Sequence, residues 1–203
     1  MSLYIIDSVE QLMALASPGR DDIVDAVGLM GPCSVPELAR FLERPHHALY
    51  YHVRALRDCG ILRERYVSKP GRKKTATYDL PGRPMSIRYK LDNEKQRRAV
   101  IALAQIRLRG AVRGFVRGCR PEIAVTSGLR RNLWVARWKG WLSESELEQA
   151  NRYLHKILDL FRHGGSRKRG RRPHEFTFAL APVLGLNEQS RVPGYSPGRG
   201  ARK

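Results

Sequence analysis

The stretch RPHHALYYHVRALRDCG, residues 44–60, gathers side chains that could do chemistry. It holds three histidines, two tyrosines and, near its end, a cysteine. Imidazoles and thiolates bind transition metals, and either group can act as a base or a nucleophile. Histidine, tyrosine and arginine also donate hydrogen bonds to the bases and phosphates of DNA. Three interpretations follow: a metal site, a catalytic cluster, or a helix that reads DNA.

The spacing of these side chains argues against a metal site. Zinc needs three or four well-placed ligands, and neither His46 with His47 nor His47 with Tyr51 makes such a set. The cysteines of the chain form no C-x-x-C pair and are widely spaced, a pattern typical of reduced thiols in an intracellular protein; they are Cys33, Cys59 and Cys119. We expect no metal and no other cofactor.

Motifs for catalysis are also missing from the sequence. No serine or cysteine has a nearby base, no paired carboxylates stand out, and neither G-x-x-x-x-G-K-[ST] nor G-x-G-x-x-G occurs. Cys59, directly before Gly60, suits packing at a helix end better than it suits a reactive thiolate. We expect that the protein is not an enzyme.

Apolar spacing predicts a helix from about His46 with one buried side. Leu49, Val53 and Leu56 recur at helical period, which leaves the polar candidates on or beside the exposed side: His46, His47, Tyr50, Tyr51 and Arg54. A preceding helix is predicted from Ser34, whose partner three residues on is Glu37, the capping-box arrangement. Two short helices joined by three or four residues predict a helix-turn-helix, in which the second helix enters the major groove.

A β-hairpin is predicted after Gly60. Residues 61–67 and 75–80 are β-prone, and residues 68–71 between them have turn chemistry. The tip of this hairpin is basic, and we expect it to contact the DNA backbone or minor groove through Lys69, Arg72, Lys73 and Lys74.

Residues 7–80 resemble the winged helix-turn-helix domain of ArsR-type bacterial transcriptional regulators. The matching segments, in chain order, are LASPGR (15–20), ELA (37–39), HVRAL with GIL (52–56 and 60–62) and YDL (78–80). The resemblance implies dimeric, operator-binding regulation. Tyr50-Tyr51 stands where the family often has serine and arginine, so its base preference does not carry over. The cysteine pair through which many ArsR-type proteins sense metals is also missing, with only Cys33 nearby.

The charge of the chain favours a polyanionic partner but lies mainly outside the predicted winged helix. The formal net charge is +19, which favours nucleic acid or an anionic membrane. Residues 1–90 hold 14 Lys and Arg against 10 Asp and Glu, whereas residues 91–203 hold 24 against 9. The basic loop 164–173 and the tail are either solvated charge or auxiliary phosphate contacts.

A long helix is predicted over residues 92–118, followed by a less regular region. Gly110, Gly114 and Gly118 recur every four residues in this helix. Each glycine costs about 1 kcal/mol in a helix interior, so the row predicts close approach of a second helix and a dimerisation surface; the alternative is that this end of the segment is not helical.

Beyond this helix, three tryptophans are either core or the wall of an effector pocket: Trp134, Trp138 and Trp141. Trp134 and Trp138, four residues apart, would share a face if this segment is helical. A capping box at Ser143 and Glu146 predicts a helix to about His163, and EFTFALAPVL (175–184) alternates like a strand.

The sequence thus predicts a mainly α protein with a small β-hairpin wing. We expect a winged helix-turn-helix domain at residues 1–84, a mostly helical dimerisation region at 85–185 and a disordered basic tail at 186–203. No signal peptide or membrane span is apparent, so a cytoplasmic location is expected. The expected function is sequence-specific regulation of transcription by a homodimer on double-stranded DNA, with no effector identified. A protein-interaction module and a non-specific nucleic-acid binder remain alternatives.

Overall fold

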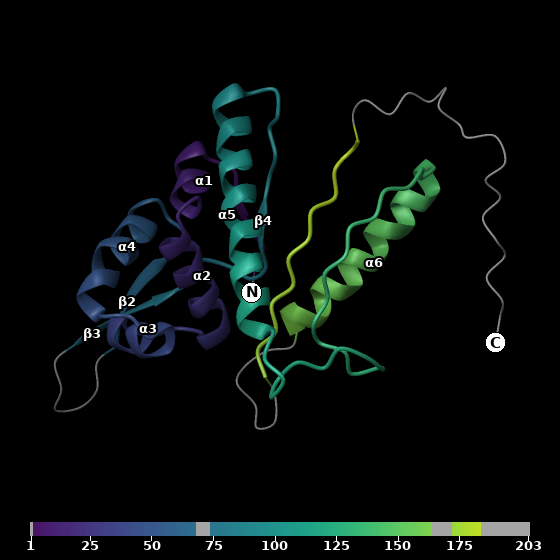
Figure 1. The fold of residues 1–203 in the computed structure, drawn as a ribbon. Coiled ribbons are helices and arrows are strands. Elements are labelled where there is room, and N and C mark those ends of the chain that lie inside the picture. The colour runs from purple at the N-terminus through teal and green to yellow at the C-terminus, as the bar shows by residue number, and fades with distance from the viewer. Residues whose placement is uncertain (1, 68–73, 164–171, 184–203) are drawn as a thin grey trace, which may run out of the picture.

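The computed structural model describes residues 2–67, 74–163 and 172–183. Within these residues the chain is mainly helical, with two small sheets (Figure 1). The elements in order are β1 (Tyr4–Ile6), α1 (Val9–Leu15), α2 (Pro18–Met30), α3 (Val35–Leu42), α4 (His46–Asp58), β2 (Arg63–Val67), β3 (Thr75–Asp79), β4 (Met85–Ile87), α5 (Glu94–Gly118) and α6 (Glu144–His163).

Local signals in the sequence set the beginnings of several helices. The Ser8 hydroxyl accepts a hydrogen bond from the backbone N–H of Gln11 at 3.1 Å and caps α1. At α3, the backbone N–H and the hydroxyl of Ser34 both donate to the Glu37 carboxylate at 2.7 Å, so the predicted capping box is confirmed. Helix α2 begins with Pro18, whose missing N–H costs nothing in a first turn.

Helices α1 to α4 share one hydrophobic core. Its largest fully buried side chains come from every one of these helices and from the two residues after Gly60: Leu12, Leu15, Ile23, Val27, Leu38, Leu49, Val53, Leu56, Ile61 and Leu62. Full burial of a leucine or valine is worth about 1.5–3 kcal/mol relative to an exposed side chain. The apolar stripe predicted for α4 therefore forms one wall of this core.

The predicted hairpin is present as β2 and β3. The strands pair antiparallel from Arg63 opposite Asp79 to Val67 opposite Thr75. An isolated bridge joins β3 to Cys33, two residues before α3: Tyr78 N–H donates to the Cys33 carbonyl at 2.8 Å, and Cys33 N–H donates to the Tyr78 carbonyl at 3.1 Å. These bonds attach the hairpin directly to the helix-turn-helix.

A second, parallel sheet was not predicted from the sequence. Strand β1 at the start of the chain pairs with β4, so that Tyr4 lies opposite Met85 and Ile6 opposite Ile87. Three residues per strand give too short a pattern to recognise, and the pairing partners lie about eighty positions apart. The sheet brings the chain from the hairpin back to α1.

Helix α5 extends the core of the N-terminal part past residue 84. Ala99 and Leu103 are buried in the same cluster as the residues of α1 to α4, and Gln96 is also buried, its side-chain amide donating to the Asp7 carbonyl. The helix begins at Asn93, whose side chain accepts from the Gln96 N–H, and continues to Gly118. The glycine row is therefore helical.

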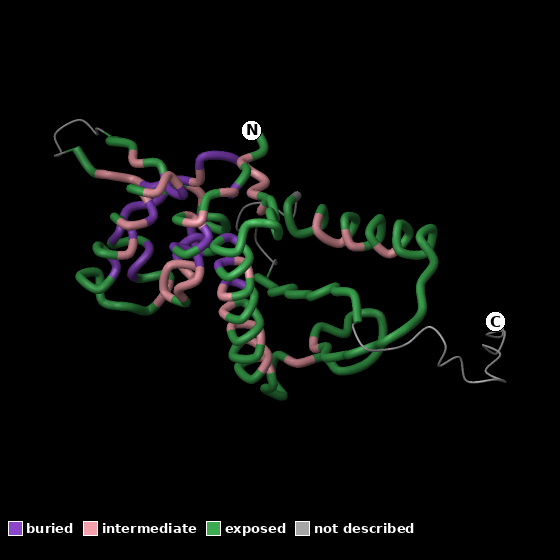
Figure 2. The backbone as a smooth tube through the Cα atoms, turned by 90° about the horizontal axis from the view of Figure 1, so that it is seen from above, coloured by how far each residue is buried: buried purple, intermediate pink, exposed green. Residues whose placement is uncertain are grey.

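The chain beyond Leu103 is much more exposed to solvent than the chain before it. No described residue from 104 to 183 is buried, whereas buried residues are frequent before that point (Figure 2). Helix α6 forms where the capping box at Ser143 and Glu146 predicts it. Residues 133–142, which hold the tryptophans, are not helical, and residues 175–183 have no strand partner among the described residues, so neither a shared helix face nor a paired strand is present. No described helix is long and apolar enough to cross a membrane.

Candidate nucleic-acid interface

The two helices of the predicted helix-turn-helix pack against each other through a short turn. Helix α3 ends at Glu43, a non-glycine residue in the left-handed region (φ 54°), and the N–H of Arg44 donates to the Ala39 carbonyl at 3.0 Å. Arg44 also forms an ion pair with Asp22 of α2. Pro45 is the N-cap residue of α4, directly before its first residue His46. The turn is therefore tied to both α2 and α3.

One side of α4 is locked into the core and the other faces solvent. Leu49, Val53 and Leu56 are at most 1% exposed. The predicted contact residues are all exposed, with Tyr50 at 51% and Tyr51 at 75%: His46, His47, Tyr50, Tyr51 and Arg54. The structure thus brings these five side chains together on one helix surface, as the sequence predicted.

The aromatic rings at the start of α4 contact one another edge-on. The His46 ring lies 6.0 Å from the His47 ring and 6.3 Å from the Tyr50 ring, measured between centroids. Tyr51 contacts His52 in the same manner at 5.7 Å. Edge-to-face contacts of this kind hold aromatic side chains in preferred orientations. These contacts therefore restrict the orientations in which the polar atoms of the rings face solvent.

His52 belongs to the packing of the domain and not to the exposed surface of α4. Its Nε2 lies 3.5 Å from the position that a Cβ would take on Gly19, at the start of α2. The Nδ1 atom is buried and has no hydrogen-bond partner among the described residues. This is an ordinary van der Waals distance, so the imidazole of His52 packs against the start of α2.

The hairpin is fixed to α4 by one carboxylate. Glu64 of β2 accepts a hydrogen bond from the hydroxyl of Tyr78 at 2.8 Å and forms an ion pair with Arg57 of α4 at 3.2 Å. Burial, with the hydrogen bond to Glu64, raises the pKa of Tyr78 to about 12, so this hydroxyl stays a donor at neutral pH. The Glu64 contacts couple the position of the wing to the helix beside it.

The structure describes only part of the predicted wing tip. Lys74 is exposed directly before β3, whereas Lys69, Arg72 and Lys73 lie outside the described residues. Sequence reasoning did not single out Arg63, Arg65 and Tyr66, which are exposed on β2. Only Glu64 of this strand is partly buried, so the strand has no alternation from which these residues could have been identified.

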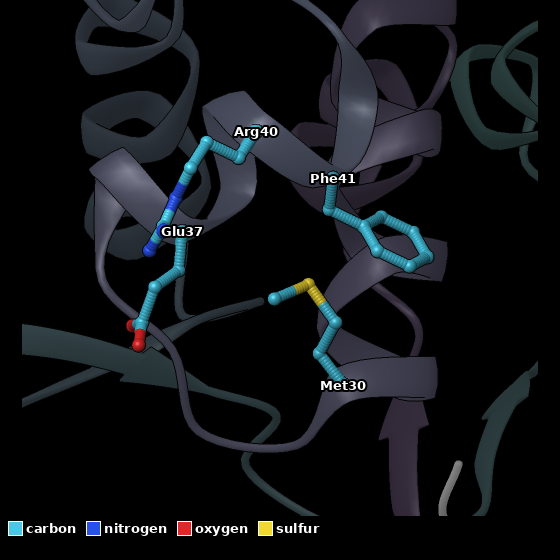
Figure 3. A pocket seen from close by; sticks show the side chains of 4 residues that line it. All are labelled: Met30, Glu37, Arg40 and Phe41. Atoms are coloured by element: carbon cyan, nitrogen blue, oxygen red, sulfur yellow. The ribbon is translucent and has the colours of Figure 1, made fainter. Parts of the chain in front are cut away.

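A hollow lies beside α3. It is lined by Met30, Glu37, Arg40 and Phe41, and Figure 3 shows it open, with Met30 and Phe41 on one side. Glu37 is engaged by Ser34 at the start of α3, so its carboxylate is committed to the helix cap. In the described part of the chain, no three His, Cys, Asp or Glu side chains gather as a metal site would require.

The cysteines show no reactive arrangement in this region. Cys33 is buried against β3, and burial raises the pKa of its thiol to about 11. Burial also raises the pKa of Cys59 at the end of α4, whose thiol donates to the Leu56 carbonyl. Thiols with raised pKa values carry little thiolate at neutral pH and are poor nucleophiles.

The predicted dimerisation glycines lie on α5, against segments of their own chain. A Cβ on Gly114 would collide with the Glu175 carboxylate, and one on Gly118 would lie 3.4 Å from Leu133. Gly110 has only the Arg113 side chain of the same helix nearby. The close approach that the glycine row predicted is thus made, within one chain, by two non-helical segments.

Comparison with known families agrees with the geometry of α2, α3 and α4. Residues 15–65, which run from the end of α1 into β2, match the family described as helix-turn-helix domain. These residues form a helix-turn-helix domain. No curated protein matches the chain. The match gives this helix-turn-helix domain a DNA partner as its expected ligand, and β2 and β3 follow it as a winged helix-turn-helix requires.

Proposed function

We propose that the protein is a sequence-specific regulator of transcription that binds double-stranded DNA as a dimer. The observation that carries this proposal is the surface of α4, where five exposed side chains able to contact bases or phosphates project from a helix whose other side is fixed in the core. A rigid helix holds such groups at a constant spacing, which base-specific hydrogen bonds need.

Helix α4 is the recognition helix of this proposal. In helix-turn-helix proteins the N-terminal residues of the second helix reach the base edges in the major groove. His46, His47 and Tyr50 lie in the first turns of α4, and Tyr51 and Arg54 follow on its exposed side. Arginine bidentate to guanine is the commonest specific contact of this kind, so Arg54 is the leading candidate for base readout.

The wing provides positioning contacts to the DNA backbone. Lys74 and Arg65 belong to a hairpin that Glu64 ties to α4, and we propose that Lys69, Arg72 and Lys73 of the same loop contact the backbone with them. Phosphate contacts fix the register of a protein on the duplex without reading its sequence. The wing then contacts phosphates while α4 contacts bases, and the two move as one unit.

A dimer would set the spacing between two half-sites. The region after residue 84 is where we place the dimer contact, at or beside the face of Gly110, Gly114 and Gly118. Leu108, Val112 and Val116 on the same helix are exposed to 44%, 64% and 65%. Apolar side chains exposed in a row on one helix are typical of an interaction surface.

Selection of genomic fragments bound by the full-length chain, followed by affinity measurements on the selected duplex, tests this function. Arg54→Ala and Tyr51→Ala should each weaken binding about ten- to hundredfold and change the preferred bases. Arg98→Ala and Tyr89→Ala, which remove exposed residues of the same types outside the helix-turn-helix, serve as matched controls and should change affinity less than about threefold.

The same experiment separates regulation from the alternatives. Binding of equal strength to random and selected duplex, at every salt concentration, would show a non-specific nucleic-acid binder. No measurable binding to either duplex would show that the winged helix serves another role. Unchanged affinity and preference in both α4 variants would overturn the assignment of α4 as the reading helix.

A further inference from the structure

The C-terminal part of the chain exposes far more apolar surface than a monomer in water normally does. Trp134, Trp138 and Trp141 are 65%, 90% and 66% exposed. Phe161, Phe176 and Phe178 are 46%, 39% and 44% exposed. Large aromatic side chains exposed in such number are typical of sites that another surface covers.

Two extended segments of this part lack backbone partners. Residues 133–142 precede α6 and residues 173–183 follow it, and both are extended chain outside any helix or strand (Figure 1). Among the described residues, no backbone–backbone hydrogen bond involves either segment. Extended chain with unpaired N–H and C=O groups is a template for pairing with another strand.

The side chains of residues 173–183 alternate as those of a half-buried strand do. The large apolar residues Phe176 and Phe178 occupy alternate positions, and Phe176 stacks on Phe161 of α6 with ring centroids 5.8 Å apart. In 133–142 an extended backbone places Trp134 and Trp138 on one side, and it places Trp141 with Arg137 and Lys139 on the other. The side of Trp134 and Trp138 therefore holds no charged residue of this segment.

The area involved is that of a stable protein interface. A buried aromatic side chain removes about 150–250 Å² from water, so the exposed fractions of Trp134, Trp138 and the three phenylalanines amount to roughly 400–700 Å². Exposed apolar side chains of α6 add to this area, and a stable interface buries about 800 Å² per partner. One copy of this surface is therefore enough for one side of a dimer.

We propose that a second copy of this chain covers this surface and that residues 133–142 and 173–183 of the two copies pair into one intermolecular sheet backed by both α6 helices. A second copy supplies the same unpaired strands and the same apolar face, so a two-fold contact satisfies both. The segments also lie where Leu133 meets Gly118 and Glu175 meets Gly114, which joins this sheet to the α5 surface. This inference rests on the dimer of the proposed function and names its interface.

The test combines association and hydrogen exchange on the full-length chain, freed of nucleic acid by nuclease treatment and purification at high salt. Sedimentation equilibrium should give a dimer. Amide exchange in residues 133–142 and 173–183 should slow as protein concentration rises through the dimer dissociation constant. A monomeric chain, or a dimer in which both segments exchange like unstructured peptide, would overturn the inference.

A pair of substitutions at one position isolates the backbone contribution. Ala179→Pro removes one strand donor in each copy and should weaken the dimer roughly tenfold or more, whereas Ala179→Ser keeps the N–H and should stay within about twofold of the wild type. Equal dimer dissociation constants for the proline and serine variants would contradict strand pairing.

Binding to a single half-site of the selected DNA keeps the two proposals separate. An Ala179→Pro monomer that still prefers the selected half-site supports the interface and leaves the DNA-reading function intact. A wild-type dimer whose two segments are protected from amide exchange, but which does not prefer the selected DNA, would contradict the proposed DNA-reading function and leave the interface intact.

Discussion

Tyr50 and Tyr51 stand side by side in α4, and both are largely exposed. Their neighbours Leu49 and Val53 are almost completely buried, so a helical period of 3.6 residues was sufficient to place the tyrosines at the surface. The same reasoning placed His46, His47 and Arg54 correctly on the helix surface. The imidazole of His52 instead lies against Gly19, a contact between α4 and α2 that spacing within one helix does not reveal.

Acidic residues on α2 give the fold a pH dependence. Asp25 lies near Asp21, Asp22, Glu175 and Arg107. Although the side chain of Asp25 is exposed at the surface, partial desolvation of its carboxyl and repulsion from Asp21 raise the pKa of Asp25 to about 6. The folded state therefore binds a proton more tightly than the unfolded chain does, and this stabilisation is present below the unfolded pKa and lost as pH rises to about 6.

Asp25→Asn should remove this pH-dependent loss. We expect the variant to be more stable than the wild type at pH 7, by no more than about 1 kcal/mol because solvent screens the site, with the difference shrinking as pH falls from about 6 to about 4. Thermal unfolding across this range and up to about pH 8 measures it. Asp92→Asn, an exposed aspartate before α5, controls for the change in net charge, and a difference independent of pH would refute the assignment.

At the scale of elements, the hairpin depends on contacts that the sequence pattern did not contain. Turn residues and β-prone runs located β2 and β3, but the Glu64 carboxylate that joins Arg57 to Tyr78 is a tertiary contact. Its members lie 7 and 14 positions from Glu64 and have no helical or strand periodicity in common. Only the packing of β2 beside the end of α4 brings them together.

Tyr78→Phe should destabilise the domain because it removes the buried hydrogen bond to Glu64. A hydrogen bond to a charged group is worth about 1.5–3 kcal/mol, and urea unfolding monitored by circular dichroism measures the change. Tyr66→Phe is the matched control, because Tyr66 on the same hairpin is 65% exposed and should change stability by less than about 0.5 kcal/mol. Equal effects of the two substitutions would exclude the proposed coupling.

Helix α5 belongs partly to the helix-turn-helix core and partly to the region beyond it. Leu103, buried in the core, and Leu108, 44% exposed, lie five residues apart on one helix. Leu103→Ala should cost about 2–5 kcal/mol in the free energy of unfolding, and Leu108→Ala well under half of that. Denaturant titration of both variants measures these losses in the free energy of unfolding. Similar losses in the two variants would mean that the core ends before α5.

At the scale of the whole molecule, most of the positive charge lies in the half of the chain that does not contain the helix-turn-helix. The helix-turn-helix lies in the half of the chain with 14 Lys and Arg against 10 Asp and Glu, whereas the second half has 24 against 9. Specific contacts from α4 and general attraction from the C-terminal half should therefore be separable, since phosphate contacts govern the salt dependence and base contacts govern preference.

Replacing the cations of the basic loop with serine tests this separation: Arg167, Lys168, Arg169, Arg171 and Arg172. The plot of log affinity against log salt concentration should become shallower by about 0.9 for each phosphate that these side chains neutralise in the wild type, with the preferred DNA sequence unchanged. Fluorescence anisotropy over a salt series gives the slope. An unchanged slope would mean that these side chains are solvated in the complex, and a changed preference would assign them to base readout.

Local features of this protein could be predicted from its amino-acid sequence alone: the beginnings of α3 and α6, the buried stripe of α4, the hairpin after Gly60 and the basic excess. Capping, helical period and turn chemistry act between residues close in the chain, so they can be recognised from the order of the amino acids. The pairing of β1 with β4, the burial of α5 at Ala99 and Leu103, the Glu64 contacts and the exposure of the tryptophans depend on which distant segments meet. These features required the three-dimensional structure, because they follow from packing and from the partners that backbone groups find in space.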